Sequence, residues 1–135
     1  MVGYSGTPLA KKLGIKEGHR IRISGAPANY LNLVSPLPKD VMISGRISQR
    51  IDIWHFFTTS YSELASKLPA MMATIQPTGA IWVSWPKKSS GVRSSVTEDS
   101  IRTIALPLGL VDIKVCAVDE TWSGLKLVIR KEHRK

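Results

Sequence analysis

The chain has 135 residues and a formal net charge of +9 at pH 7, with 43% hydrophobic and 21% charged residues. This length favours one domain, and this composition is typical of a soluble globular protein. No apolar run approaches the ~18 residues of a membrane-spanning helix, and residues 1–13 lack the apolar core of a secretory signal, so we expect a cytoplasmic protein without a membrane partner.

The positive charge favours an anionic partner, either a small molecule or a macromolecule. The basic residues are spread along the chain, and their only dense run is the tail at 131–135. Nucleic acid is therefore an alternative partner that we do not favour. The one cysteine, Cys116, cannot form an internal disulfide, and its strand-like surroundings predict a small buried side chain.

The first third of the chain predicts short elements. Residues 7–14 form a helix with Thr7 as N-cap, Pro8 in the first helical position and Gly14 as the left-handed exit. The next expected elements are a strand at 19–24 ended by Gly25-Ala26-Pro27, a weak helix at 28–34, a short strand at 41–43 and a loop at 44–50.

The middle of the chain predicts the centre of a sheet. Residues 51–57 are apolar on both faces, which is typical of a strand inside a parallel sheet. Ser60 and Glu63 form an S-x-x-E capping box that opens a helix, and Pro77-Thr78-Gly79 ends that helix. Residues 81–85 then form a second apolar strand, which Pro86 terminates.

The last third predicts a helix followed by a β-hairpin. Thr97 is the N-cap of this helix, and Pro107 with Gly109 closes it. Strands at 111–118 and 125–130 flank a connection at 119–124. The whole order predicts a single α/β domain: a small, mostly parallel Rossmann-like sheet with helices on its faces and an antiparallel C-terminal hairpin.

Three blocks of residues carry a resemblance to a known family. They are Gly3–Leu9 with Lys11–Ile15, Trp85–Lys88 with Ser90-Gly91, and Gly109–Asp112 with Lys114–Leu125. In these blocks the chain resembles a bacterial family of uncharacterised proteins, the domain of unknown function 3052 family. That resemblance implies relatives but no activity.

A looser resemblance is to the second half of a Rossmann-like methyltransferase, in which a helix follows each of two central strands and a terminal hairpin closes the sheet. The chain departs from that pattern in two places. Ser24-Gly25-Ala26-Pro27 replaces a glycine-rich turn, and no acidic residue ends the 41–43 strand to hold a ribose. The identity of a cofactor therefore stays open.

In open α/β sheets, ligands bind at the carboxyl ends of the parallel strands. Here those ends, together with the hairpin turn, bring polar groups to one edge. The candidate ligand-binding residues are Gly25, Thr58, Thr59, Ser60, Lys87, Lys88, Asp119 and Trp122. Each also has a structural interpretation: Ser60 as a helix cap, Lys87 and Lys88 as a solvated turn that pairs with Asp119 or Glu120, and Trp122 as a hairpin corner.

No catalytic motif is present. The three histidines lack metal-ligand spacing, His55 reads as a core histidine with a hydrogen-bond partner, and neither a nucleophile elbow nor a Walker loop occurs. The leading hypothesis is a non-enzymatic module that binds an anionic small molecule or partner at the strand-end cleft. The alternatives are a small methyltransferase-like transferase and a nucleic-acid-binding protein.

Overall fold

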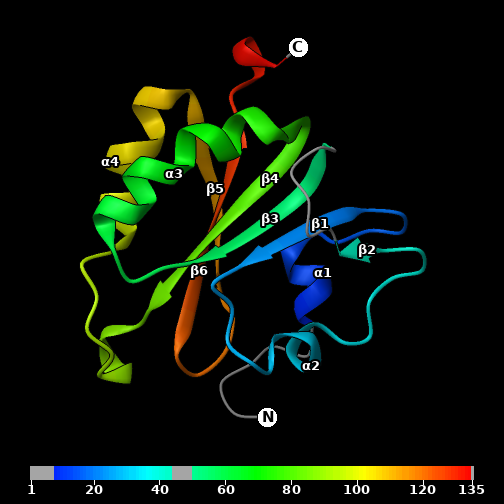
Figure 1. The fold of residues 1–135 in the computed structure, drawn as a ribbon, viewed down its shortest axis with the longest axis horizontal. Coiled ribbons are helices and arrows are strands. Elements are labelled where there is room, and N and C mark those ends of the chain that lie inside the picture. Colours follow the sequence, from blue (N-terminus) through cyan, green and yellow to red (C-terminus); the bar gives the residue numbers. More distant parts are fainter. Residues whose placement is uncertain (1–7, 44–49, 135) are drawn as a thin grey trace.

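The computed structural model describes residues 8–43 and 50–134. These residues build one six-stranded sheet in the order β2-β1-β3-β4-β6-β5 (Figure 1). The strands are β1 (Arg20–Ser24), β2 (Met42–Ile43), β3 (Ile51–Phe57), β4 (Ile75–Pro86), β5 (Leu110–Ala117) and β6 (Trp122–Ile129). The helices are α1 (Leu9–Leu13), α2 (Tyr30–Val34), α3 (Tyr61–Thr74) and α4 (Glu98–Leu108), with short 3-10 turns η1 (Lys88–Ser90) and η2 (Lys131–His133).

The sheet has a parallel part and an antiparallel end. β2, β1, β3 and β4 pair in parallel, whereas β6 runs antiparallel to β4 and β5 antiparallel to β6. This arrangement confirms the predicted single α/β domain with a mostly parallel sheet and a C-terminal hairpin. The chain moves outward from β1 to β2 and then returns to β3 on the other side of β1. The strand order therefore reverses between β1 and β3, which is where open α/β sheets bind ligands.

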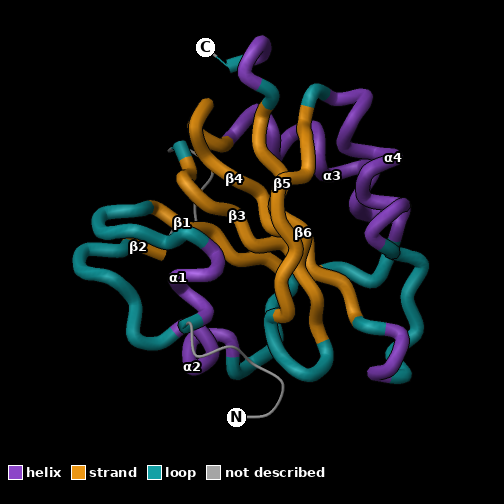
Figure 2. Tube along the Cα trace, turned by 180° about the vertical axis from the view of Figure 1, so that it is seen from behind, coloured by secondary structure: helices purple, strands orange, loops and turns teal. Residues whose placement is uncertain are grey.

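The two faces of the sheet are covered by different helices. Figures 1 and 2 show α3 and α4 together on one side of the molecule and α1 with α2 on the other. Neighbouring residues of β3 point into different cores: Trp54 and Phe56 pack with α3 and α4, and Ile53 and Phe57 with α1 and α2. β3 is thus buried on both faces, as its apolar sequence predicts.

A buried hydrogen bond ties α1 to the centre of the sheet. The indole N–H of Trp82, which is fully buried on β4, donates to the carbonyl of Leu13 at 2.9 Å. Gly14 then takes the left-handed conformation, with φ 82°, that ends the helix as predicted. Pro8 is the N-cap of α1 and not its first helical residue, because the helix begins at Leu9. The predicted capping role of Thr7 and the loop at 44–49 lie outside the described residues.

Two strands begin earlier than their sequences predict. β4 starts at Ile75, so Pro77-Thr78-Gly79 lies inside a strand and does not end a helix. The buried Ile75 pairs with Ile51 across a register shift. Gly79 allows this approach, since a Cβ there would lie 2.8 Å from the carbonyl oxygen of Asp52.

β6 likewise starts at Trp122, which shortens the predicted 119–124 connection. The Asp119 carboxylate accepts from the backbone N–H groups of Thr121 and Trp122, and this turn lets the strand begin at once.

The long helices begin as predicted. The Ser60 side chain accepts a hydrogen bond from the Glu63 backbone, and the Thr97 side chain accepts one from Ser100, which returns a bond to the Thr97 backbone. Gly109 closes α4 in the left-handed conformation, although Pro107 lies within the helix. Among the described residues, no helix has both the length and the apolar character needed to cross a membrane.

The end of β1 generates a stability prediction. Gly25 has φ 68°, and a Cβ at this position would lie 2.5 Å from the Phe57 carbonyl oxygen. Gly91 has φ 77° but open space around it. We expect Gly91→Ala to cost about 1 kcal/mol of unfolding free energy from backbone strain, and Gly25→Ala about 3 kcal/mol, because a clash is added. Urea denaturation of the two variants measures both costs, and equal costs would contradict the tight contact between β1 and β3.

Candidate functional site

The carboxyl ends of β1, β3 and β4 lie at one edge of the sheet, which we call the rim. The Thr58 backbone N–H donates to the Ser84 carbonyl at 3.0 Å, so the exit of β3 lies beside β4. Pro86 at the end of β4 pairs with Trp122, and the Lys87 N–H donates to the Thr121 carbonyl at 2.8 Å. The β5–β6 turn therefore lies at the same rim as the strand ends.

Gly25 places the exit of β1 directly against the end of β3. Its left-handed backbone turns the chain away from the sheet, while the missing side chain allows contact with the Phe57 carbonyl. Gly25 itself is exposed. At the switch point between β1 and β3, Gly25 therefore contacts the end of β3 on one side and is exposed to solvent on the other.

The segment after β3 is an internally bonded helix cap. The buried Thr58 hydroxyl donates to a Glu63 carboxylate oxygen at 2.6 Å and accepts from the Ser60 N–H at 3.1 Å. In a capping box, the Glu63 side chain would accept a hydrogen bond from the Ser60 backbone N–H. Here the Thr58 hydroxyl accepts that bond and in turn donates to Glu63. The hydrogen bond from Thr58 lowers the pKa of Glu63, with a smaller contribution from Lys67 and burial opposing both.

Thr59 is the exposed residue of this segment. Its carbonyl accepts from the Ser95 N–H at 3.0 Å, which fixes the backbone. Since Thr58 and Ser60 bond within the cap, Thr59 is the member whose side chain faces solvent.

The predicted lysine–carboxylate pairing does not form. Lys87 Nζ donates to the backbone carbonyl of Asp119 at 2.9 Å, while the Asp119 carboxylate accepts the two N–H groups of its own turn. Lys88 is exposed in η1. In the part of the chain that the structure describes, no ion pair joins either lysine to Asp119 or Glu120.

Trp122 is half-buried and packs at the hairpin corner. Its ring meets Phe57 edge to face, with 5.1 Å between ring centroids. The structural interpretation of this residue therefore holds, and the ring contributes an aromatic edge to the rim. The structure thus brings Gly25, the Thr58–Ser60 segment, Lys87, Asp119 and Trp122 to one edge, while their role as ligand contacts stays a prediction.

A buried polar relay lies under the rim. His55 Nδ1 lies 2.8 Å from the Tyr30 hydroxyl, and its Nε2 lies 2.7 Å from the Ser84 hydroxyl. The imidazole also stacks on Phe57, with 4.3 Å between ring centroids. His55 is therefore a core histidine with partners, as predicted. Sequence reasoning missed Tyr30 and Ser84, although a lone serine inside the apolar run 81–85 is a signal for a buried hydroxyl.

Burial sets the protonation states of this relay. It lowers the pKa of His55 to about 3 and raises the pKa of Tyr30. Both groups are neutral at physiological pH, which suits a structural relay better than proton transfer. Burial also raises the pKa of the half-buried Cys116 thiol, with Lys12 and Lys114 opposing it weakly, so this cysteine is mainly protonated.

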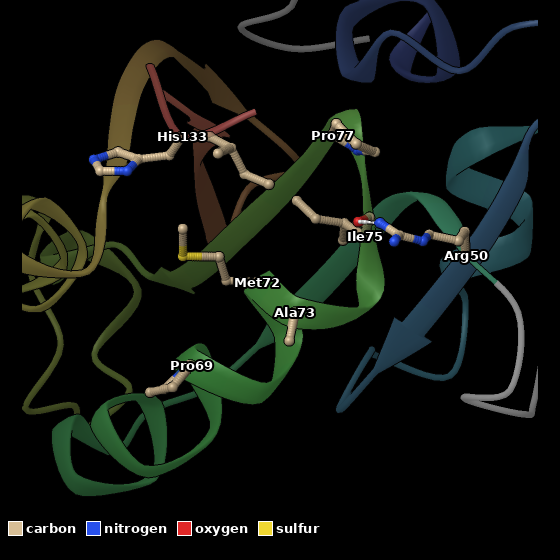
Figure 3. Close-up of a pocket in the computed structure, with 8 residues that line it drawn as sticks. Arg50, Pro69, Met72, Ala73, Ile75, Pro77 and His133 are labelled. Carbon is tan, nitrogen blue, oxygen red and sulfur yellow. Dashed lines mark hydrogen bonds between the residues drawn. The ribbon is translucent and has the colours of Figure 1, made fainter. Parts of the chain in front are cut away.

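Hollows in the described surface lie away from the rim. One of about 380 Å³ lies at the end of α3, where Figure 3 shows Arg50 and His133 on either side of Met72 and Ile75. Another of about 420 Å³ lies beside Lys16 and Lys126. No group of three or more His, Cys, Asp or Glu side chains within residues 8–43 and 50–134 is placed to hold a metal ion.

Comparisons by sequence give no match: neither a protein-family model nor a curated protein matches the chain. The resemblance to the domain of unknown function 3052 family is therefore unsupported.

Comparisons by structure give mainly methyltransferases, together with a possible exported protein from Bordetella parapertussis that superposes with a TM-score of 0.63 and 9% identity over 90% of this chain and 66% of that one. A putative type 11 methyltransferase from Sulfolobus solfataricus superposes with a TM-score of 0.66 and 10% identity, covering 94% of this chain and 95% of that one. A methyltransferase dependent on S-adenosylmethionine (SAM) from Aquifex aeolicus gives a TM-score of 0.59 and 17% identity over 90% and 88%. A ribosomal protein L11 methylase from Lactobacillus delbrueckii gives 0.60 and 9% over 90% and 75%.

These likenesses show a Rossmann-like fold that the chain shares with methyltransferase structures, and they support the looser of the two resemblances. They also overturn the leading functional hypothesis. The expectation of a non-enzymatic module rested on missing catalytic motifs, whereas most of the matched structures are methyltransferases and favour the transferase alternative.

The relay generates a prediction on pH dependence. Because the folded-state pKa of His55 is about 3 and the unfolded value is about 6.5, the unfolded chain binds the extra proton between these values. Stability should therefore fall as pH falls through this window, by up to about 1.4 kcal/mol per pH unit. His55→Gln, whose amide offers a donor and an acceptor, should flatten this slope in urea denaturation at pH 7, 6, 5 and 4. His19→Gln is the control, and equal slopes in all three proteins would contradict the buried neutral imidazole.

Proposed function

We propose that this chain is a small methyltransferase-like transferase whose site is the rim. The observation that carries the proposal is the strand order, with its reversal between β1 and β3 and its antiparallel β6–β5 end. The whole arrangement superposes on methyltransferase structures over 90–94% of the chain.

The cofactor of such a transferase is S-adenosylmethionine, which supplies an activated methyl group when bound. The rim contains groups that suit it. Gly25 exposes its backbone to solvent at the switch point, and Thr59 is exposed and carries a hydroxyl. The strand β2 ends at Ile43 with no carboxylate among its described residues, so Asp119 is the candidate acceptor for the ribose hydroxyls. Its Oδ1 already accepts two backbone N–H groups, which leaves Oδ2 for a ligand.

The other rim residues orient and support these contacts. Lys87 fixes the β5–β6 turn by its bond to the Asp119 carbonyl, and the Thr58–Glu63 bond holds the segment that presents Thr59. Trp122 and Phe57 form an apolar floor beside them. An ordered rim of this kind suits positioning chemistry, in which the protein aligns a methyl donor with its acceptor.

Calorimetric titration tests the proposal. We expect the full chain to bind S-adenosylmethionine and S-adenosylhomocysteine and to gain thermal stability from them. Thr59→Arg places a long side chain over the rim and should weaken binding at least roughly tenfold, by steric exclusion and by repulsion of the sulfonium. Thr103→Arg, at an exposed position of α4, should bind as the parent does. The absence of binding by the parent chain at millimolar ligand, or equal loss in both variants, would contradict the proposal.

A further inference from the structure

A group of lysines lies on the sheet face that carries α1, away from the rim. Lys114 of β5 and Lys126 of β6 are direct partners in the antiparallel register. Like charges placed opposite each other across two strands destabilise a sheet. Lys16, in the turn after α1, lies near enough to Lys126 to repel it, and together the three define what we call the lysine groove.

The lysines of this groove have no carboxylate partners. In residues 8–43 and 50–134, no ion pair involves Lys16, Lys114 or Lys126. The nearest acid on β5, Asp112, is bound to Arg102 of α4 at 2.9 Å. Lys114 Nζ donates only to the Lys12 carbonyl, at 3.2 Å. Within the described residues, these three ammonium groups therefore lack a carboxylate at ion-pair distance.

The groove is concave and large enough for a small ligand. Its cavity of about 420 Å³ is lined by Lys16, His19, Asp52, Gly79, Ile113 and Lys126, among others, while Lys114 lies beside it as the cross-strand partner of Lys126. The half-buried Lys126 places its ammonium nitrogen beside Gly14, where a Cβ would come within 3.3 Å of it. Its ammonium is thus held at the wall of the cavity, where burial lowers the pKa of Lys126 and like charge from Lys114 and Lys16 lowers it further.

Two further side chains give the cavity a polar pattern. His19 Nδ1 accepts from the Lys16 N–H at 3.1 Å, so the neutral imidazole carries its hydrogen on Nε2 and can donate it. Asp52 lines the same cavity, and one of its oxygens accepts from the Arg20 N–H at 2.8 Å. The groove therefore combines several donors with one acceptor carboxylate.

We propose that the lysine groove binds a phosphomonoester, with its phosphate on Lys16 and Lys126, a hydroxyl of the esterified group on Asp52, and Lys114 adding positive charge from beside the cavity. A dianionic phosphate neutralises the unpaired ammonium groups and relieves the repulsion across β5 and β6. A carboxylate in the wall favours a ligand that also donates hydrogen bonds, such as a sugar phosphate or a mononucleotide. A concave cavity of about 420 Å³ favours a small molecule over a nucleic acid strand.

This proposal does not depend on methyl transfer at the rim. The test uses the full chain at constant ionic strength, titrated with inorganic phosphate, glucose 6-phosphate, adenosine 5′-monophosphate and a single-stranded RNA oligomer. We expect saturable binding of the phosphomonoesters and a rise in melting temperature that chloride does not reproduce. S-adenosylmethionine binding to the same proteins reports separately on the rim.

Lysine variants locate the site. Lys126→Gln should weaken phosphomonoester binding at least roughly tenfold, and the exposed Lys16→Gln should weaken it severalfold without affecting the core. Lys131→Gln in η2 is the matched control and should bind as the parent does. Lys114→Gln should raise the melting temperature of the ligand-free chain by roughly 1–3 °C, since it removes a cross-strand repulsion.

Several results would overturn the proposal. The first is the absence of phosphomonoester binding, and the second is an equal loss of binding in the Lys131→Gln control. The third is a rise in melting temperature that chloride at the same ionic strength reproduces. The fourth is a Lys114→Gln variant that is no more stable than the parent. Tighter binding of RNA than of the phosphomonoesters, lost in Lys126→Gln, would assign the groove to nucleic acid instead.

Discussion

The burial of β3 and β4 on both faces is the constraint on which the rest of this structure depends. Side chains of β3 alternate between two cores, with Trp54 and Phe56 on one face and Ile53 and Phe57 on the other. Each buried side chain of this size contributes about 1.5–3 kcal/mol when removed from water. Both faces of the sheet must therefore be covered, and the connections between strands must supply helices to each. The alternation of strand and helix in the sequence follows from this requirement.

Coverage on two faces also explains the polar relay. A histidine in the middle of a doubly buried strand must find partners for both ring nitrogens, because an unpaired polar group in that position costs about 1–3 kcal/mol. Ser84 supplies one partner from β4, and Tyr30 supplies the other from α2. α2 has only five residues, too few to form a stable helix by itself. The Tyr30 bond therefore helps to fix this helix over the end of β3, directly beneath the rim.

The sequence predicts the elements whose pattern is local. The Ile51–Phe57 strand, the Ser60 and Thr97 caps and the left-handed exits at Gly14 and Gly109 depend on residues within a few positions of one another. The early start of β4 was not predictable in this way. Proline and glycine at 77 and 79 normally indicate a turn, and only the contact of Gly79 with the backbone of β3 makes this segment a strand.

The candidate site, too, has a part that the sequence predicts and a part that depends on contacts between distant residues. That the strand ends and the hairpin turn share one edge follows from the parallel order, so the grouping of the rim residues was predictable. The use of their polar atoms was not, because it depends on side-chain geometry: Thr58 bonds Glu63, and Lys87 bonds a carbonyl and not a carboxylate. The non-enzymatic expectation failed for a related reason. A transferase that works by positioning needs no nucleophile or metal motif, so the lack of such motifs does not argue against it.

The lysine groove follows from incomplete coverage of the sheet. α3 and α4 have 14 and 11 residues, whereas α1 and α2, on the opposite face, have five each. Helices that short cannot shield all of the face that extends over β6 and β5. Lysine is suited to a half-open strand position because its stem covers apolar surface while its ammonium reaches solvent. A neutral polar side chain could fill the same positions without repulsion, however, and Lys114 directly opposite Lys126 is therefore not explained by coverage alone. Neutralisation by a bound anion accounts for both the position and the charge of these residues.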